Sequence, residues 1–370
     1  MSLTASSALE GSAIDEFALI RRYFESHATE KLARDGAGNA LATDVALGIG
    51  DDCALLRPRA GCVAAVTTDT LVAGRHFPLE TPPHAIGWKA LAVSLSDLAA
   101  MAAEPQAFVL ALTLPEVDAN WLEAFAAGLF ELAGACGIAL VGGDTTRGPL
   151  TLNITAIGQV PERQALRRSG ARIGDVICVT GTLGDAALAL QRLKLNRVDS
   201  ASAHDAFGHD ALTTRDAESA VKDALSADAW LQRRLDYPTP RLKAGVLLRD
   251  IARAAIDLSD GLAGDLGHIL VASGVGAEID ADALPMSSAF AQLHDAGERL
   301  RLQAAGGDDY ELCICLPPAQ LERAQALLKS DADIVLTSIG RIVAGRGITW
   351  LDSQIRQLDF KLGGYDHFRS

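Results

Sequence analysis

Apolar and polar positions along the chain follow two periods, one typical of helices and the other of strands. Apolar residues recur every three or four positions in three long segments, which predicts helices over 14–26, 84–103 and 119–136. Gly137 directly follows the third segment, as is common at helix C-termini. Short runs rich in apolar and β-branched residues predict strands over 45–56, 62–68, 106–114, 138–141 and 150–160. Helices interleaved with strands favour an α/β fold.

The second half repeats this alternation with different spacing. Pro161 and the basic stretch 163–168 mark a domain boundary, and the polar segment 195–228 is predicted to be a helical or partly ordered insertion. We therefore expect two domains, an N-terminal one over 1–160 and a C-terminal one over 161–370. Further elements are predicted over 175–180 (strand), from 186 (helix), 242–254 (helix), 310–316 (strand), 319–329 (helix) and 334–342 (strand).

Composition excludes several classes of function. The chain has 370 residues, 49% hydrophobic and 22% charged, with a net charge of −14, which argues against nucleic acid as a main partner. No uninterrupted apolar run reaches the length of a membrane span, and the first residues lack the pattern of a signal peptide. The six cysteines form no Cys-x-x-Cys pair. We expect a cytoplasmic protein with reduced thiols and no membrane partner.

Acidic residues recur beside Gly, Ser or Thr at predicted strand ends. One Asp in such a turn is most often a turn former or helix cap. A series of them indicates a magnesium–polyphosphate site, because carboxylates are hard oxygen ligands and small neighbours let a ligand approach the backbone. The motifs are GIGDD (48–52), TTDT (67–70), SLSD (94–97), GGD (142–144), IDLSDG (256–261) and GGDDYE (306–311).

Within these motifs, spacing limits which carboxylates act together. Asp257 and Asp260 can point into one cleft if a helix begins at Ser259 or Asp260, and Ser259 is equally suited to be that helix's N-cap. In the adjacent pairs 51–52 and 308–309 only one member of each pair can face a site. Two further residues have both a functional and a structural interpretation. Arg168 can either bind a phosphate group with two hydrogen bonds or be a solvated loop residue. His76, without other information, is interpreted as structural.

Other phosphotransfer and hydrolase signatures are absent from the sequence. There is no GxxxxGK[ST] loop, no protein-kinase motif set and no GxSxG. No cysteine lies near a suitable histidine partner in the sequence. This favours direct transfer over a covalent enzyme intermediate.

The ordered series of motifs closely resembles the thiamine-monophosphate kinase family. The matching segments are GIGDDCALL (48–56), TTDTLVAGRHF (67–77), KALAVSLSDLAAM (89–101), GGDTTRGPL (142–150), RRSGARIGD (167–175), VTGTLGD (179–185), IDLSDGLAGDLGHI (256–269), GGDDYELC (306–313) and GYDHF (364–368). The resemblance implies an ATP-dependent enzyme that phosphorylates thiamine monophosphate with Mg²⁺. It also implies two α/β domains, a homodimer paired through the N-terminal sheets, and nucleotide binding between the domains.

The resemblance assigns roles to individual positions. One departure weakens one of them: the family usually has Gly-Gly-Glu-Asp-Tyr where this chain has Asp308, which is one methylene shorter. The implied roles are metal binding for Asp52, Thr67, Thr68, Asp69, Asp97, Asp144, Asp257 and Asp260; nucleotide binding for Gly143, Asp144, Arg168 and Ser259; and contact with thiamine phosphate for His76, Asp308 and Tyr365.

Two alternatives stay open at this point. Relatives such as selenophosphate synthetases share single motifs, but they need a reactive cysteine in an N-terminal Gly-rich segment, and the first cysteine here is Cys53. A non-catalytic nucleotide- or metal-binding regulator would be expected to have lost part of the Asp set, and no member is missing.

Overall fold

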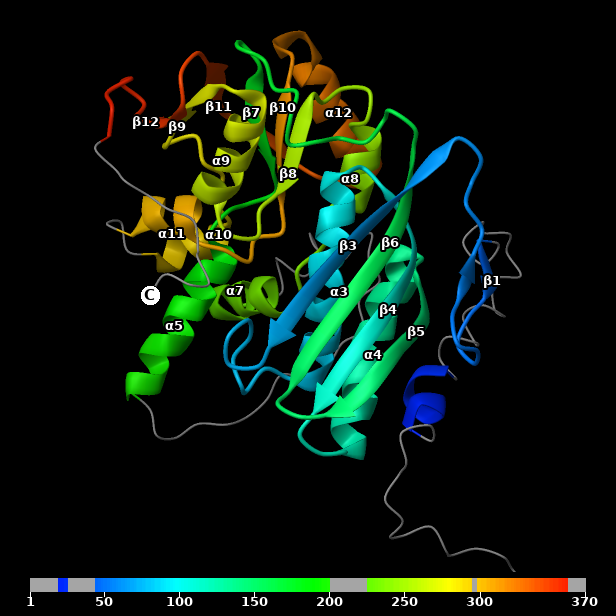
Figure 1. Cartoon of the computed structure of the whole chain (residues 1–370). Coiled ribbons are helices and arrows are strands. Elements are labelled where there is room, and N and C mark those ends of the chain that lie inside the picture. The colour runs from blue at the N-terminus through cyan, green and yellow to red at the C-terminus, as the bar shows by residue number, and fades with distance from the viewer. Residues whose placement is uncertain (1–18, 26–43, 200–224, 295–297, 359–370) are drawn as a thin grey trace, which may run out of the picture.

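The computed structural model describes residues 19–25, 44–199, 225–294 and 298–358, and of 195–199 only the backbone. Two sheets organise these residues (Figure 1). A four-stranded sheet lies in the N-terminal half and a six-stranded sheet in the C-terminal half. A short hairpin, β1 (Val45–Leu47) and β2 (Leu55–Leu56), lies beside the first sheet.

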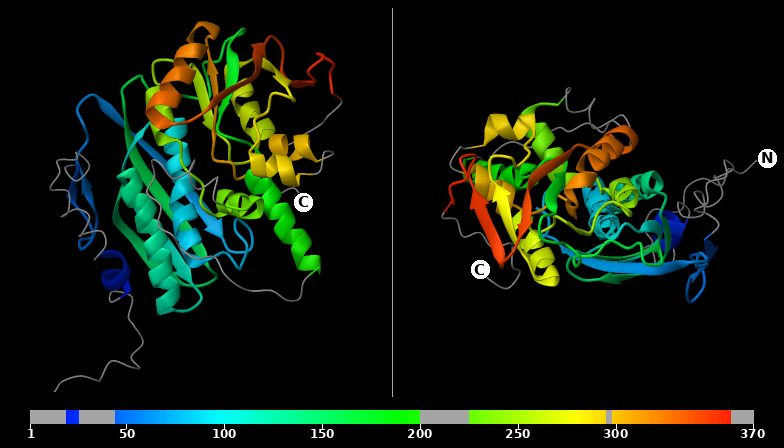
Figure 2. Two further views of the ribbon diagram at one scale, coloured as in Figure 1. Left: turned by 180° about the vertical axis from the view of Figure 1, so that it is seen from behind. Right: turned by 90° about the horizontal axis from the view of Figure 1, so that it is seen from above.

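The N-terminal sheet has the strand order β3-β6-β4-β5. Only β4 and β5 are parallel; β6 pairs antiparallel with both β3 and β4. Two long helices cover one face of this sheet (Figure 2). The bounds are β3 (Cys62–Val72), α3 (Pro83–Ala100), β4 (Glu104–Leu114), α4 (Ala119–Cys136), β5 (Ala139–Arg147) and β6 (Thr151–Pro161), with a short π-helix η1 (Arg21–Glu25) before them.

Local sequence signals set the ends of these two helices. The side chain of Asp118 accepts hydrogen bonds from the backbone N–H groups of Asn120 and Trp121, which caps α4 at its start. Gly137 ends α4 with a φ of 67°. The two helices cross so closely at Gly87 that a Cβ there would lie 2.1 Å from the carbonyl oxygen of Phe125. The sequence prediction for α4 is confirmed to the residue.

Helix α3 is buried on almost every side. Its residues contribute both to the core over the N-terminal sheet, through Leu91 and Leu95, and to a second core with α8 and the six-stranded sheet, through Ala99 and Ala100. A helix that is apolar all round is expected to lie in the interior. Helix α3 therefore separates the two halves and contacts both.

The C-terminal sheet has the order β12-β9-β11-β7-β10-β8, antiparallel except for the β12–β9 pair. Helices α9 and α12 lie beside it (Figures 1 and 2). The bounds are β7 (Val176–Thr180), α5 (Asp185–Asp199), α7 (Ala227–Asp236), α8 (Leu242–Leu247), β8 (Ala254–Asp257), α9 (Leu262–Ser273), β9 (Gly276–Asp280), α10 (Ser288–Leu293), α11 (Arg299–Ala305), β10 (Leu312–Leu316), η2 (Pro318–Gln320), α12 (Leu321–Ala332), β11 (Leu336–Val343) and β12 (Gly347–Leu351).

The expected mixed α and β architecture is confirmed, but three local predictions are wrong. Residues 45–56 form a hairpin and not one strand, because the glycines and aspartates of 48–52 lie in its loop. The GGD segment (142–144) lies inside β5, where it pairs with β4, and not in a loop. Helix α8 ends at Leu247, well short of residue 254.

Two further points concern sequence predictions for less regular parts. The polar insertion is partly outside the described residues, and its described ends belong to the helices α5 and α7. Strands β9 and β12 were not predicted from the sequence. Within the described ranges, no helix combines the length and apolar character that crossing a bilayer requires.

Candidate functional site

Two serines on α3 reach aspartates in different halves of the molecule. Residues two apart on a helix point about 200° away from each other. Accordingly, the hydroxyl of Ser94 donates to Asp69 Oδ2 on β3 at 2.8 Å, and that of Ser96 donates to Asp257 Oδ2 at the end of β8 at 2.8 Å. The central helix thus links a carboxylate of the N-terminal sheet to one of the C-terminal sheet.

Asp97 lies beside both of these aspartates. Its side chain is half-buried and accepts a hydrogen bond from the hydroxyl of Thr67. Thr67 and Asp69 are two apart on β3 and share the face of the sheet that α3 covers. Thr68 points to the opposite face, where its hydroxyl lies 3.0 Å from that of Thr155 on β6. The structure therefore brings Thr67, but not Thr68, to the acidic cluster.

The acidic cluster, defined here as Asp69, Asp97 and Asp257, is electrostatically strained. Burial, and then the charge of Asp97, raise the pKa of Asp69 to about 6, against the effect of the Ser94 hydrogen bond. Burial, and then the charges of Asp97, Asp265 and Asp69, raise the pKa of Asp257 to about 8. The charges that act most strongly on Asp257 are thus other carboxylates, so the cluster favours proton or cation binding.

The loop between β8 and α9 forms the next part of the site. Helix α9 begins at Leu262, after Gly261, so the predicted helix start at Ser259 or Asp260 is wrong. Asp265, in the first turn of α9, instead accepts the backbone N–H of Asp260 at 3.0 Å. Burial raises the pKa of Asp265 to about 7, while the guanidinium of Arg168 lowers it. Arg168, itself exposed, therefore lies near the loop that carries Ser259 and Asp260.

The loop over 306–311 packs against Ser259. The backbone N–H of Asp308 donates to the carbonyl oxygen of Ser259 at 2.9 Å. One carboxylate oxygen of Asp308 lies 3.2 Å from Lys89 Nζ on α3, and the other accepts from the Tyr310 hydroxyl at 3.0 Å. The neighbouring Asp309 points the other way, is buried, and accepts the backbone N–H of Gly184 at 2.9 Å.

The expectation that only one member of the 308–309 pair faces the cleft is thus consistent with this geometry. Glu311 closes the loop from the other side, since it is fully buried between Arg234 and Arg241 and accepts the Thr180 hydroxyl at 2.7 Å. These contacts hold the loop in one place relative to the acidic cluster.

Asp144 and Gly143 lie away from this cluster. In the register of the sheet, Asp69 aligns with Ile154, then Leu110, then Gly143, three strands across. At about 4.8 Å per strand spacing, Asp144 is on the order of 14 Å from Asp69. Asp144 is exposed, and Gly143 lies so close to β4 that a Cβ there would be 1.9 Å from the Leu110 carbonyl oxygen.

A cavity of about 490 Å³ opens near these residues, at the end of β5. Its lining consists of Leu19, Leu114, Glu116, Val117, Thr145, Thr146 and Arg147. It therefore belongs to the β5 edge of the N-terminal sheet, not to the acidic cluster.

Asp52 is also separate from the cluster. It is exposed in the loop of the β1–β2 hairpin. This hairpin packs through Val45 and Leu56 onto Ala107 of β4 and Val141 of β5, so it lies over the opposite end of the sheet from β3 (Figure 1).

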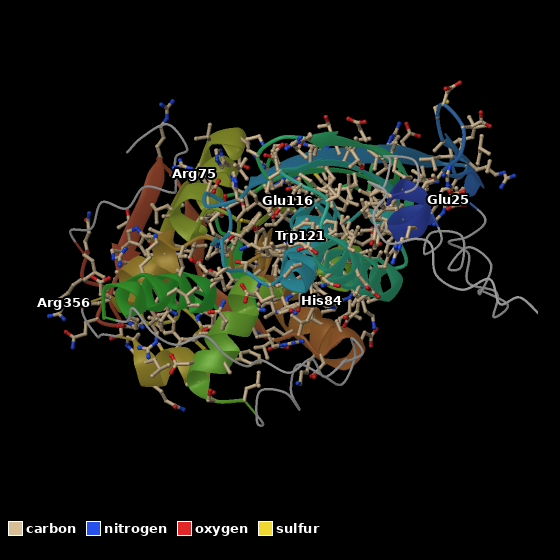
Figure 3. The ribbon with its side chains drawn as sticks, turned by 90° about the horizontal axis from the view of Figure 1, so that it is seen from below. Glu25, Arg75, His84, Glu116, Trp121 and Arg356 are labelled. Atoms are coloured by element: carbon tan, nitrogen blue, oxygen red, sulfur yellow. The ribbon has the colours of Figure 1, made fainter. Side chains whose placement is uncertain are left out.

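The three residues predicted to contact thiamine phosphate have different placements. His76 is half-buried in the turn after β3, and its Nδ1 accepts the backbone N–H of Val72 at 2.9 Å. Arg75 of the same turn lies at the opposite end of the N-terminal half from Glu25 of η1 (Figure 3). Asp308 lies in the loop described above, and Tyr365 is outside the described residues.

Sequence reasoning missed four residues that the geometry brings to the site. Ser94 and Ser96 were visible in the SLSD motif, but only their position on a helix between two sheets shows that they point apart. Lys89 is the one Lys or Arg of α3, a helix whose other residues are mostly apolar, and this was a usable signal. Asp265 carried a weaker signal, as an acidic residue in the first turn of a predicted helix.

The donor set fits Mg²⁺ in its chemistry. Among the described residues, no three His, Cys, Asp or Glu side chains surround a point closely enough to bind one ion by themselves. Mg²⁺ usually takes one or two carboxylates and completes its shell with water and substrate phosphates. A crowded set of carboxylates whose strongest charged neighbours are each other fits that requirement.

Both halves of the chain are similar to known protein families. Two family models match, "AIR synthase related protein, N-terminal domain" over residues 50–160 and "AIR synthase related protein, C-terminal domain" over residues 172–351. Thiamine-monophosphate kinases of Salmonella typhimurium and Escherichia coli K12 are 45% and 44% identical over 359 residues, which cover 96% of this chain and 99% of each relative.

A solved structure is similar over nearly the same extent. The thiamine-monophosphate kinase of Stenotrophomonas maltophilia K279a is 46% identical, with a TM-score of 0.76, covering 91% of this chain and 96% of that one. The chain belongs to the thiamine-monophosphate kinase family.

Proposed function

We propose that the protein transfers the γ-phosphoryl group of ATP to thiamine monophosphate, which yields thiamine diphosphate and ADP. Family membership supports this activity. The structural observation that carries the proposal is the acidic cluster, in which Asp69 and Asp97 of one half meet Asp257 of the other. We propose that a nucleotide and a second anion meet beside this cluster, between the two domains.

Charge repulsion is the main physical obstacle to this reaction. Two like charges about 4 Å apart cost on the order of 4 kcal/mol at an effective dielectric constant near 20. Bound Mg²⁺ would neutralise charge on the phosphates and on the phosphoryl group in transfer. We propose that Asp69, Asp97 and Asp257 hold it, with the Thr67 hydroxyl fixing the orientation of Asp97.

The remaining metal assignments rest on the family resemblance. Asp260 lies in the adjoining loop, whereas Asp52, Thr68 and Asp144 lie on other faces or edges of the N-terminal sheet. We keep these four, together with Thr67, as proposed residues of a site for several Mg²⁺ ions.

The chain's own residues would handle the two substrates. We propose that Arg168 and Ser259 contact the nucleotide beside the α9 N-terminus, together with Gly143 on β5, and that His76, Asp308 and Tyr365 contact thiamine phosphate. The acceptor is a phosphate already ionised near neutral pH, so it requires no strong general base. We therefore propose direct in-line transfer without a phosphorylated enzyme.

We further propose a cytoplasmic homodimer that pairs through its N-terminal sheets. The outer face of β3 exposes Val66, which is 64% accessible in the single chain. Exposed apolar side chains on a sheet face are consistent with such pairing. Sedimentation analysis tests the dimer directly.

Incubating the purified protein with ATP, Mg²⁺ and thiamine monophosphate tests the activity. We expect ADP and thiamine diphosphate in equal amounts, with ATP consumption that depends on thiamine monophosphate. Selenide replaces the acceptor in a parallel reaction, to separate selenophosphate synthetase chemistry. ATP consumption that is independent of thiamine monophosphate, or none at all, would contradict the proposal.

A further inference from the structure

Lys89 is a buried cation at the boundary between the two halves. It lies in α3 and is only 2% exposed, among buried neighbours that include Trp88 and Ala90. A buried ammonium group is costly unless it has an anionic partner. Its Nζ lies 3.2 Å from Asp308 Oδ2, on a loop of the C-terminal half.

The face of α3 that carries Lys89 is the face that meets the C-terminal half. Lys89 and Ser96 are seven residues apart, which places them on one side of the helix, about 10 Å apart along its axis. Ser96 donates to Asp257, and Lys89 pairs with Asp308. The same helix face therefore positions one carboxylate of the acidic cluster and, two turns away, the carboxylate assigned to the acceptor.

Asp308 is held at several points but keeps open acceptor sites. Its backbone has a φ of 68°, and its N–H donates to Ser259. Its carboxylate takes one contact from Lys89 and one from the Tyr310 hydroxyl, and the side chain remains 27% exposed. A carboxylate has about four lone-pair directions, so two contacts leave room for a ligand.

A second carboxylate interacts electrostatically with Lys89 and with Asp308. Asp236, at the end of α7, is buried; its burial raises its pKa, and the charge of Lys89 lowers it. Gln232 donates to Asp236 at 2.7 Å. The charge of Lys89 thus acts on both Asp236 and Asp308, and it limits their mutual repulsion.

We propose, on the basis of the proposed function, that Lys89 is a positioning residue for the acceptor substrate. It holds the Asp308 carboxylate in a fixed orientation, from which the carboxylate attracts the positively charged thiazolium of thiamine monophosphate. We assign the role to the acceptor because Lys89 forms its ion pair with Asp308, the residue proposed to contact thiamine phosphate. Loss of the ammonium group leaves Asp308 repelled by Asp236 and free to turn away.

Steady-state kinetics with Lys89→Met test this role, because methionine keeps the length and removes the charge. We expect the KM for thiamine monophosphate to rise at least about tenfold, while kcat and the KM for ATP change less than about threefold. Asp308→Asn should show the same selective rise. Combining the two changes should add little to Asp308→Asn alone, because Lys89 acts through Asp308.

Arg249→Met provides the matched control. Arg249 also joins the two halves, through Glu104 at 3.0 Å and the Ala102 carbonyl oxygen at 2.7 Å, but on a different part of the boundary. We expect no selective change in the KM for thiamine monophosphate. If Lys89→Met changes kcat and both KM values together, as a loosened boundary would, Lys89 is only structural and the proposal is wrong.

Two outcomes remain to be separated. If Lys89→Met does not fold, Asp308→Asn decides, since an unchanged KM for thiamine monophosphate in that variant overturns the proposal. If the unmodified protein does not phosphorylate thiamine monophosphate, the proposed function fails first, and the assignment of Lys89 fails with it.

Discussion

Replacing Asp69 with asparagine should stabilise the protein when divalent cations are removed. Asparagine keeps the size of the side chain and an oxygen that can accept the Ser94 hydroxyl, but it has no charge. Burial and the neighbouring Asp97 raise the pKa of Asp69 from 3.8 to about 6. Each pKa unit corresponds to about 1.4 kcal/mol, so the ionised carboxylate costs the folded state up to about 3 kcal/mol.

The sign of the effect depends on pH. The folded protein holds the Asp69 proton more tightly than the unfolded chain, so this residue costs nothing below about pH 4. Stability is then lost as the pH rises from about 4 to about 6, and the cost stays constant above that range. Asp69→Asn lacks this loss. Without divalent cations, the free energy of unfolding of this variant should exceed that of the unmodified protein by about 1 to 3 kcal/mol at pH 8 and should equal it near pH 4.

Urea unfolding in EDTA at both pH values measures this difference. Asp144→Asn serves as the control, because Asp144 is an exposed aspartate on the other edge of the same sheet, and its change should stay within about 0.5 kcal/mol. Adding Mg²⁺ should stabilise the unmodified protein more than Asp69→Asn. If Asp69→Asn is equally or less stable than the unmodified protein at pH 8 in EDTA, the ionised Asp69 carboxylate does not destabilise the fold and the reasoning is refuted.

Three other predictions follow from particular contacts. The midpoint Mg²⁺ concentration for thermal stabilisation should rise as the pH falls from 8 to 6, because protons compete for Asp257, whose pKa is raised to about 8; a flat profile would contradict this. Glu311→Gln should lower the free energy of unfolding by about 3 to 5 kcal/mol, because it removes the buried carboxylate with which both Arg234 and Arg241 pair. Glu278→Gln, in a more exposed pair with Arg341, should lower it by less than about 1 kcal/mol. Gly143→Ala should lower the free energy of unfolding by about 1 to 3 kcal/mol, because its new Cβ would clash with the Leu110 carbonyl oxygen. Gly142→Ala, whose new Cβ would lie 3.8 Å from Val109, should lower it less. Similar midpoints of urea unfolding for the two variants would disprove the close approach of Gly143 to β4.

The sequence predicted the long elements well because their signals are local. Asp118 and Gly137, which cap helix α4, directly flank the predicted segment, and strands β3, β4 and β6 are long runs rich in apolar residues. Strands β9 and β12 are short, and their pairing joins residues some 70 positions apart. Such pairing depends on tertiary contacts that a local pattern does not contain.

Sequence spacing indicated which aspartates could gather, but not which of them do. Asp69, Asp97 and Asp257 come together in space because β3, the end of β8 and the central helix converge on the boundary between the halves. Asp144 does not join them, because its segment extends β5 instead of forming a loop, and strand order puts β5 three places from β3. Only the sheet topology contains that information.

Helix α3 has a consequence for how the molecule can move. Its residues belong to the cores of both halves, and Gly245 of α8 approaches it so closely that a Cβ there would lie 2.0 Å from the Ala99 carbonyl oxygen. Sliding or swinging one half past the other would break this backbone contact and open apolar surface to water. Substrate entry and release are therefore expected to depend on the short loops around the helix, with the two halves behaving as one stiff frame that melts in a single transition.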